Sequence, residues 1–320
     1  MTVLVLTKAL DPTADLVISE LNDRRVPVCR LDPGDFPENL TVSARIGGST
    51  REWTGSVRGQ HRGLPLDQVR SVYYRRPSAF RLSPDLSDTD ARWARAEALA
   101  GFRGLLASLD CPWVNHPDRN AAAGVGPVAL ATASRCGLTV PATLITNDPD
   151  EARSFIKDLP AQIAAYKGLG DADPGEIDGW PQALWTTQVT AADITDTVTL
   201  TAHWFQEWIP KAYEVRLTVV GDQLFGAKIH AGSKESRIDF RKDYDSLTYS
   251  PCTIPFGIAE GVRRLMAAFG LRYAAMDFLV NPDGRWFLVD LNPNGQWAFV
   301  PDLRPAITHA LADLLEEPTP

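Results

Sequence analysis

Short apolar runs alternate with segments of helical spacing along the first part of the chain. Residues 2–6 and 26–31 form two apolar runs, and in residues 11–25, between them, apolar positions recur every three or four residues. A short apolar run predicts a buried strand, and helical spacing after Asp11, a residue type that caps helices, predicts a helix. The chain is therefore expected to open with a β-α-β unit.

Helix and strand patterns continue to alternate in the rest of the chain. Helical spacing predicts helices over residues 89–109, 128–136, 258–269 and 303–317. Apolar or alternating runs predict strands that include residues 197–209, 213–229 and 272–292. We expect an α+β / α/β fold with an N-terminal unit over residues 1–117 and two lobes over residues 118–200 and 201–320. A ligand cleft would lie between the two lobes.

Composition narrows the class of protein. With 320 residues the chain has room for two or three domains, and 44% hydrophobic and 22% charged residues are typical of an ordinary enzyme. The net charge of -8 argues against a general nucleic-acid-binding face. The chain lacks an apolar stretch of about 20 residues and a leader pattern, so we expect a cytoplasmic protein that binds neither nucleic acid nor membrane. The phosphate-binding P-loop, the GxGxxG pattern and paired cysteines are also absent from the sequence.

Two aspartates and one asparagine lie in a segment that a turn folds back on itself. Residues 281–284 read Asn-Pro-Asp-Gly, and a four-residue loop there would put Asp277 opposite Leu288. Strand alternation then places Asp277, Asp290 and Asn292 on the same face as Leu288, with the two aspartates diagonal to each other at about 7–8 Å. Such oxygen ligands suit Mg²⁺. In the alternative reading, each aspartate pairs with a basic residue on a neighbouring strand.

Three other features could hold a nucleotide. A strand leads Lys167 into a glycine-rich loop, residues 168–175, which suits a phosphate, although a surface lysine before a turn is the simpler reading. Residues 206–209 leave a strand and could offer backbone groups to a purine. Glu214 and Arg216 are two residues apart and so share a face of the next strand. Their alternative reading is an exposed ion pair of little energetic weight.

The order of these features resembles the ATP-grasp superfamily, and more closely the ATP-grasp peptide maturases that build graspetides, of the microviridin-ligase type. The resemblance covers nearly the whole chain, and the segments that carry it are YYRRP, GLTVPATLITNDP, FQEWIPKAYEVRLTVVG, HAGSKESRIDFRKDY and VDLNPNGQW. It implies an ATP-grasp fold, in which a pre-ATP-grasp domain precedes two lobes that enclose ATP and Mg²⁺.

The resemblance also assigns roles to residues. The nucleotide would be bound by Lys167, Gln206, Glu207, Trp208, Ile209, Glu214 and Arg216, with the backbone of Glu207 and Ile209 on the adenine and Lys167 and Arg216 on the phosphates. The metal ligands would be Asp277, Asp290 and Asn292. Arg216 and Arg241 would be catalytic, and Arg75, Arg76 and Arg241 would bind an acidic peptide. For Arg75 and Arg76 the alternative is that they only keep a strand edge soluble.

The activity that the resemblance implies is ATP-dependent ligation. A carboxylate of an Asp or Glu side chain is phosphorylated, and a hydroxyl or amine of the same ribosomal precursor peptide then displaces phosphate and closes an ester or amide macrocycle. The partner would be that peptide, with its leader and core, and a homodimer is compatible with the sequence. One alternative is a ligase that joins a small carboxylic acid or amino acid to an amine. Another is a non-catalytic nucleotide- or peptide-binding homologue.

One departure from the family pattern favours the non-catalytic alternative. Family members usually carry a lysine and a glutamine where this chain has Gly126 and Ala129. Loss of one charge-assisted phosphate contact weakens binding by about 1.5–3 kcal/mol. The lysines considered as substitutes are Lys8, Lys157, Lys211 and Lys228.

Overall fold

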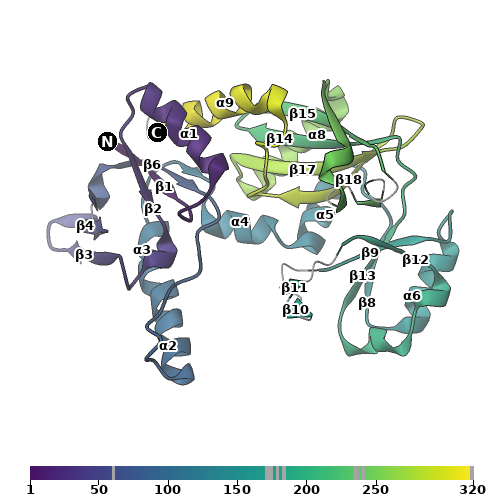
Figure 1. Cartoon of the computed structure of the whole chain (residues 1–320), viewed down its shortest axis with the longest axis horizontal. Coiled ribbons are helices and arrows are strands. Elements are labelled where there is room, and N and C mark those ends of the chain that lie inside the picture. Colours follow the sequence, from purple (N-terminus) through teal and green to yellow (C-terminus); the bar gives the residue numbers. More distant parts are fainter. Residues whose placement is uncertain are drawn as a thin grey trace.

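The computed structural model contains an N-terminal domain and two lobes (Figure 1). It describes residues 1–59, 62–169, 176–177, 180–181, 185–233, 236, 238–239 and 242–317. Within this part of the chain, helices and mixed sheets bear out the predicted α+β class. None of its helices is long and apolar enough to cross a membrane.

The N-terminal domain is built on a parallel sheet. Its strands in spatial order are β2 (Val28–Leu31), β1 (Thr2–Leu6), β6 (Val69–Tyr74) and β7 (Trp113–Val114). Helix α1 (Pro12–Asp23) begins after Asp11, whose carboxylate accepts the N–H groups of Thr13 and Ala14. This cap satisfies backbone donors that the first turn leaves unpaired, which confirms the predicted β-α-β opening.

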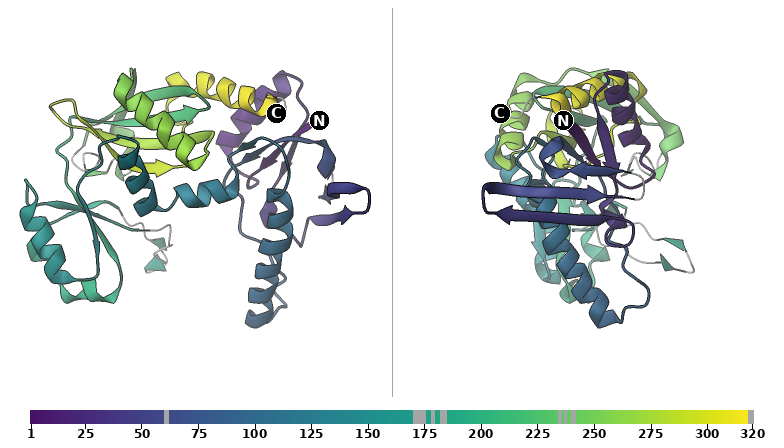
Figure 2. Two further views of the ribbon diagram at one scale, coloured as in Figure 1. Left: turned by 180° about the vertical axis from the view of Figure 1, so that it is seen from behind. Right: turned by 90° about the vertical axis from the view of Figure 1, so that its left-hand side faces the viewer.

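A helical arm and a small sheet extend from this domain. The arm consists of α2 (Asp88–Ala98), the π-helical turn η3 (Leu99–Arg103) and α3 (Gly104–Ala107). Helix α2 points away from both lobes (Figures 1 and 2), and Ala98 is its one buried residue. The small sheet contains β3 (Thr41–Gly47), β4 (Thr50–Arg58) and β5 (Gly63–Pro65). Short 3₁₀ turns are η1 (Pro33–Asp35), η2 (Leu66–Gln68), η4 (Ala191–Asp193), η5 (Asp196–Leu200), η7 (Tyr244–Ser246) and η8 (Pro301–Leu303).

The central lobe is a four-stranded sheet covered by helix α6 (Pro149–Asp158). Its strands in spatial order are β12 (Thr187–Val189), β9 (Ala164–Lys167), β13 (His203–Glu207) and β8 (Thr143–Thr146). Strand β13 pairs with both β8 and β9, so the expected boundary between residues 200 and 201 is corrected: the central sheet reaches Glu207. The chain before β13 forms η5 rather than the predicted strand from residue 197. A separate pair, β10 (Glu176–Ile177) and β11 (Trp180–Pro181), lies beside this lobe.

The C-terminal lobe is a five-stranded antiparallel sheet. Its strands in spatial order are β16 (Leu247–Cys252), β15 (Gln223–Ala231), β14 (Tyr213–Val220), β17 (Tyr273–Val280) and β18 (Trp286–Asn292). Helices α5 (Gly126–Arg135) and α8 (Phe256–Phe269) cover one face, where Ala133, Leu265 and Phe278 are fully buried together. Residues 126–138, expected in the central lobe, therefore pack on this sheet instead, because their apolar positions face its core.

The chain returns to the N-terminal domain at its end. Helix α9 (Arg304–Glu316) packs against α1 and β6, and Leu311 shares a buried cluster with Val5 and Val17. Helix α4 (Pro117–Ala123) bridges the same two regions from the other side (Figure 1). The N-terminal domain and the C-terminal lobe thus share a continuous core.

Candidate nucleotide and metal site

A cleft of about 1020 Å³ lies between the central and C-terminal lobes. It is lined by most of the residues that the sequence predicts for the site: Lys167, Gln206, Glu207, Trp208, Ile209, Glu214, Asp277, Asp290 and Asn292. Arg216 lies behind Asp277 and is 7% exposed. Arg75 and Arg76 belong to the N-terminal domain, and Arg241 lies outside the described residues.

The two aspartates face each other across the β17–β18 hairpin. Asp277 is directly opposite Asp290. The turn pairs Val280 with Trp286, so its loop is one residue longer than predicted, and Val289 forms a bulge between the Phe278–Leu288 and Asp277–Asp290 pairs. The predicted diagonal arrangement is therefore wrong, as is the shared face of Leu288 and Asp290: Leu288 pairs with Phe278, which is fully buried in the core, whereas Asp290 pairs with Asp277 in the cleft. An extra residue in one strand reverses the facing of the side chains that follow it, and this brings the two carboxylates closer than predicted.

A buried arginine holds the first aspartate. Arg216 Nη1 donates to both carboxylate oxygens of Asp277, at 2.8 and 2.9 Å, and its Nη2 donates to the backbone oxygen of Gln296 at 3.0 Å. Burial alone would lower the pKa of Arg216, but Asp277, together with Tyr273 and Asp290, outweighs burial and the pKa is raised. The alternative reading of an Asp paired with a basic neighbour thus holds for Asp277. One lone-pair direction of each oxygen can still face the cleft, since a carboxylate has about four acceptor sites.

Lys167 joins the two lobes across the cleft. It ends β9, and its Nζ donates to the carbonyl of Val289, the bulged residue of β18, at 2.8 Å. The same ammonium lies 5.0 Å from the centre of the Trp204 ring, on the neighbouring strand β13. Lys167 is therefore a cleft residue, and the surface-lysine reading is wrong.

Trp204 was not singled out from the sequence. It is 3% exposed, and a Cβ at Gly126 would lie 3.1 Å from the edge of its ring. The indole thus fills the space into which a side chain at residue 126 would extend. The signal was present, because Trp204 and Gln206 are two residues apart on one strand and must share the face that meets the cleft.

Some backbone groups at the end of β13 already form hydrogen bonds within the protein. The N–H of Glu207 donates to the carbonyl of Ala142 at 2.8 Å, and that of Trp208 donates to the carbonyl of Ile163 at 3.3 Å. The Gln206 side chain donates to the Thr143 hydroxyl at 3.0 Å. Contact with adenine thus remains a prediction for the Glu207 carbonyl and the Ile209 N–H.

A second lysine enters the cleft beside Glu214. Lys211 Nζ donates to Glu214 Oε1 at 2.6 Å. Burial raises the pKa of Glu214, although Lys211 acts in the opposite direction. Of the four lysines considered as substitutes for the missing one, Lys211 is the one that lines this cleft. Asn292 also lines it, and its Oδ1 accepts the N–H of Asn294 at 2.9 Å.

The paired arginines of the N-terminal domain differ in burial. Arg75 is 1% exposed, and its Nε lies 3.0 Å from Asp11 Oδ2, while its Nη2 donates to Gln296. Peptide contact by Arg75 does not fit this burial, because the side chain is enclosed by its own ion pair. Arg76 is exposed and donates to the carbonyl of Asn294 at 3.2 Å, so the predicted peptide contact remains open for Arg76 alone.

We expect Arg75→Met to destabilise the protein by about 3–5 kcal/mol, because it leaves the Asp11 carboxylate buried without its partner. Arg76→Met, the matched control, should change stability by less than about 0.5 kcal/mol. Urea unfolding followed by circular dichroism measures both. Equal stability of the two variants would contradict this assignment.

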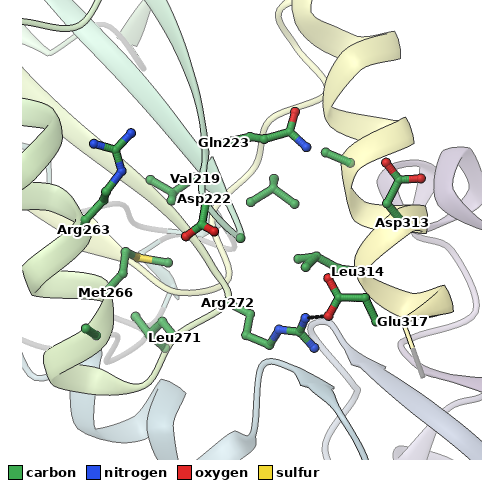
Figure 3. A pocket seen from close by; sticks show the side chains of 14 residues that line it. Val219, Asp222, Gln223, Arg263, Met266, Leu271, Arg272, Asp313, Leu314 and Glu317 are labelled. Atoms are coloured by element: carbon green, nitrogen blue, oxygen red, sulfur yellow. Dashed lines mark hydrogen bonds and ion pairs between the residues drawn. The ribbon is translucent and has the colours of Figure 1, made fainter. Parts of the chain in front are cut away.

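A second cavity, of about 590 Å³, lies between the β14–β15 turn and helices α8 and α9. Figure 3 shows the basic side chains of Arg263 and Arg272 and the acidic side chains of Asp222, Asp313 and Glu317 around it, and Arg272 is paired with Glu317. None of the predicted site residues lines it. The site is therefore assigned to the cleft between the lobes.

Comparisons with known proteins agree with this fold. Residues 2–121 match the family described as the MvdD pre-ATP grasp domain. A search of curated proteins gave no match. The macrocyclase MdnC from Microcystis aeruginosa MRC, solved bound with the precursor peptide MdnA, is 28% identical with a TM-score of 0.86, over 98% of this chain and 99% of that one. The macrocyclase MdnB from the same organism is 27% identical with a TM-score of 0.80, over 98% and 99%.

A third solved structure extends the likeness in fold. The Chryseobacterium gregarium RiPP-associated ATP-grasp ligase, in complex with ADP and a leader and core peptide, is 24% identical with a TM-score of 0.90, over 98% of this chain and 96% of that one. The fold is an ATP-grasp fold, with a pre-ATP-grasp domain before the two lobes. Within that class, the predicted resemblance to the ATP-grasp maturases of ribosomal peptides is confirmed.

Proposed function

We propose that this chain is an ATP-dependent ligase that activates Asp or Glu side chains of a ribosomal precursor peptide and closes ester or amide macrocycles. The observation that carries the proposal is the cleft in which Lys167, Asp277 and Asp290 converge between two lobes. The likeness of this chain to two macrocyclases, over nearly the full length of each chain, supports the choice of a peptide as the substrate.

The donor set fits Mg²⁺. Two carboxylates directly opposite each other would repel, and the Arg216 guanidinium balances the charge of one of them from behind. Among the described residues, no group of three His, Cys, Asp or Glu side chains could by itself hold a metal. Magnesium commonly takes one or two carboxylates and completes its octahedron with water and phosphate oxygens. Asp277, Asp290 and Asn292 would hold it, and it would neutralise phosphate charge when bound.

The chain's own groups bind and orient the reactants. Lys167 presents its ammonium to the phosphates, and Arg216 fixes the direction of the Asp277 carboxylate. A peptide carboxylate oxygen attacks the γ-phosphorus of ATP, and ADP leaves. A hydroxyl or amine of the peptide then attacks the acyl phosphate carbon, loses its proton, and releases inorganic phosphate. Positioning and charge neutralisation supply the acceleration, so no protein nucleophile is required.

Release of ADP tests the proposal. We expect ADP to form only when the enzyme, Mg²⁺ and ATP meet an acidic precursor peptide, with loss of one water mass from the peptide for each ADP. ADP formed with free amino acids and amines would instead favour the small-molecule ligase. Failure to form ADP, together with intact nucleotide binding, would favour the non-catalytic homologue suggested by Gly126.

Two further expectations accompany this function. A reaction that consumes ATP fits a cytoplasmic enzyme. A homodimer stays a prediction, which sedimentation velocity would test.

A further inference from the structure

A mostly apolar pocket lies in the N-terminal domain beside the helical arm. Its volume is about 390 Å³, within the range of about 300–1,000 Å³ typical of ligand sites. Aromatic rings dominate its wall, and they belong to Tyr74, Phe80, Phe102 and Trp113. We name this the anchor pocket. It takes no part in the nucleotide site described above.

The anchor pocket is adjacent to the cleft between the lobes. Both cavities are lined by Tyr74, Leu99, Arg103 and Pro117, so a peptide bound in the pocket lies next to the cleft. Two residues after Tyr74, the exposed Arg76 contacts the carbonyl of Asn294, itself a lining residue of the cleft. A cationic side chain therefore lies beside a lining residue of the cleft.

Positive charge marks the anchor pocket. Its charged lining residues, within the described part of the chain, are Arg95 and Arg103. Arg103 pairs with Asp118 at 2.8 Å, but both side chains are substantially exposed, 39% and 69%, so this pair is weak and open to exchange. On a protein of net charge -8, two cations beside an apolar hollow complement an acidic chain that carries an apolar side chain.

The arm leaves apolar surface at the rim of the anchor pocket. Leu99, the first residue of the π-helical turn, is 45% exposed although it lines the pocket. Single π-helical turns occur frequently at functional sites, where they redirect side chains. Burial of Leu99 and of the exposed face of Phe80 would favour an occupant.

We propose that the anchor pocket binds an aromatic side chain of the peptide substrate, with acidic neighbours on Arg95 and Arg103, and so places the reacting carboxylate in the cleft. This rests on the proposed function and adds the substrate feature that it leaves open: an aromatic residue close in sequence to the acidic residue that is activated. The pocket is then a specificity site and takes no part in the chemistry.

Two fluorescein-labelled peptides test the pocket, Asp-Glu-Phe-Glu-Asp and Asp-Glu-Ala-Glu-Asp, titrated against the full chain and followed by anisotropy. We expect the Phe peptide to bind at least about tenfold more tightly, because burial of a Phe side chain contributes about 1.5–3 kcal/mol. Leu99→Glu and Arg95→Glu should each weaken its binding by about fivefold or more. The matched controls on the same helix, Trp93→Ala and Arg92→Glu, should leave it unchanged, since neither side chain lines the pocket.

Failure of this inference and failure of the proposed function give different results. Equal affinity for the two peptides, or no effect of Leu99→Glu and Arg95→Glu, overturns the anchor pocket even if Mg²⁺ and ATP bind normally. If the wild type fails to bind Mg²⁺ and ATP, the proposed function is contradicted. The peptide titration still tests the anchor pocket in that case. A concentration-dependent dimer lost in Leu99→Glu would show that a second copy covers the arm, and would also overturn the proposal.

Discussion

Replacement of Asp290 by asparagine is expected to lower ADP release by more than about a hundredfold, the loss typical when one preorganised electrostatic contact is removed from an active site. Asp290 lines the cleft opposite Asp277. The substitution removes one negative charge without a change in volume, so the thermal unfolding midpoint should stay near that of wild type. A coupled ADP assay across a range of Mg²⁺ concentrations is the measurement.

The Asp277→Asn and Asp290→Asn variants should both lose activity, but they should differ in the stability of the folded protein. Asp277→Asn removes the charge partner of Arg216, whose side chain is 9% exposed, and leaves a buried cation, at a cost of up to about 3–5 kcal/mol. Asp283→Asn, in the exposed turn of the same hairpin, is the matched control and should affect neither property. Normal turnover of Asp290→Asn at limiting Mg²⁺ would remove Asp290 from the site.

The β17–β18 hairpin shows which features of the site can be predicted from the sequence and which cannot. Turn residues 281–284 correctly predicted a hairpin that brings Asp277 and Asp290 near each other, but the predicted register, with Asp277 opposite Leu288, was wrong by two residues. One residue comes from the turn, which pairs Val280 with Trp286, and one from the bulge at Val289, which no glycine or proline marks and whose carbonyl accepts the Lys167 ammonium from another lobe. The register therefore depends on the turn conformation and on a contact remote in sequence.

The boundary between the two lobes, expected between residues 200 and 201, was misplaced for a similar reason. A strand pattern at residues 203–207 says that a strand forms, but its partners, β8 and β9, are set by the tertiary fold. The burial of Arg75 depends likewise on Asp11 and Gln296, which lie 64 residues before it and 221 residues after it. Arg75 and Arg76 follow the end of β6 at Tyr74, and Arg76 has a positive φ of 42°, so strand alternation does not apply to them and the fold alone decides which of the two faces solvent.

Lys167→Ala is expected to raise the dissociation constant for ATP by about ten- to a hundredfold, the effect of one lost charge-assisted contact of about 1.5–3 kcal/mol. Lys167 lies in the cleft, bridges to Val289 in the other lobe, and has its ammonium over Trp204. The same cleft has Gly126 in place of a second family lysine, so the remaining cations carry a larger share of the phosphate charge. Calorimetric titration with ATP and Mg²⁺ gives the constant directly.

A matched lysine separates phosphate binding from general loss of charge. Lys228 also lies over an aromatic ring, 4.5 Å from the centre of Tyr213, but it does not line the cleft. Lys228→Ala removes the same charge and should leave ATP affinity unchanged. Lys167→Arg keeps the charge and should recover part of the loss, because the longer guanidinium reaches phosphate with a different geometry. If Lys167→Ala binds ATP as tightly as wild type, Lys167 serves only to join the two lobes, and the phosphate contact falls to Lys211, the other described lysine that lines the cleft.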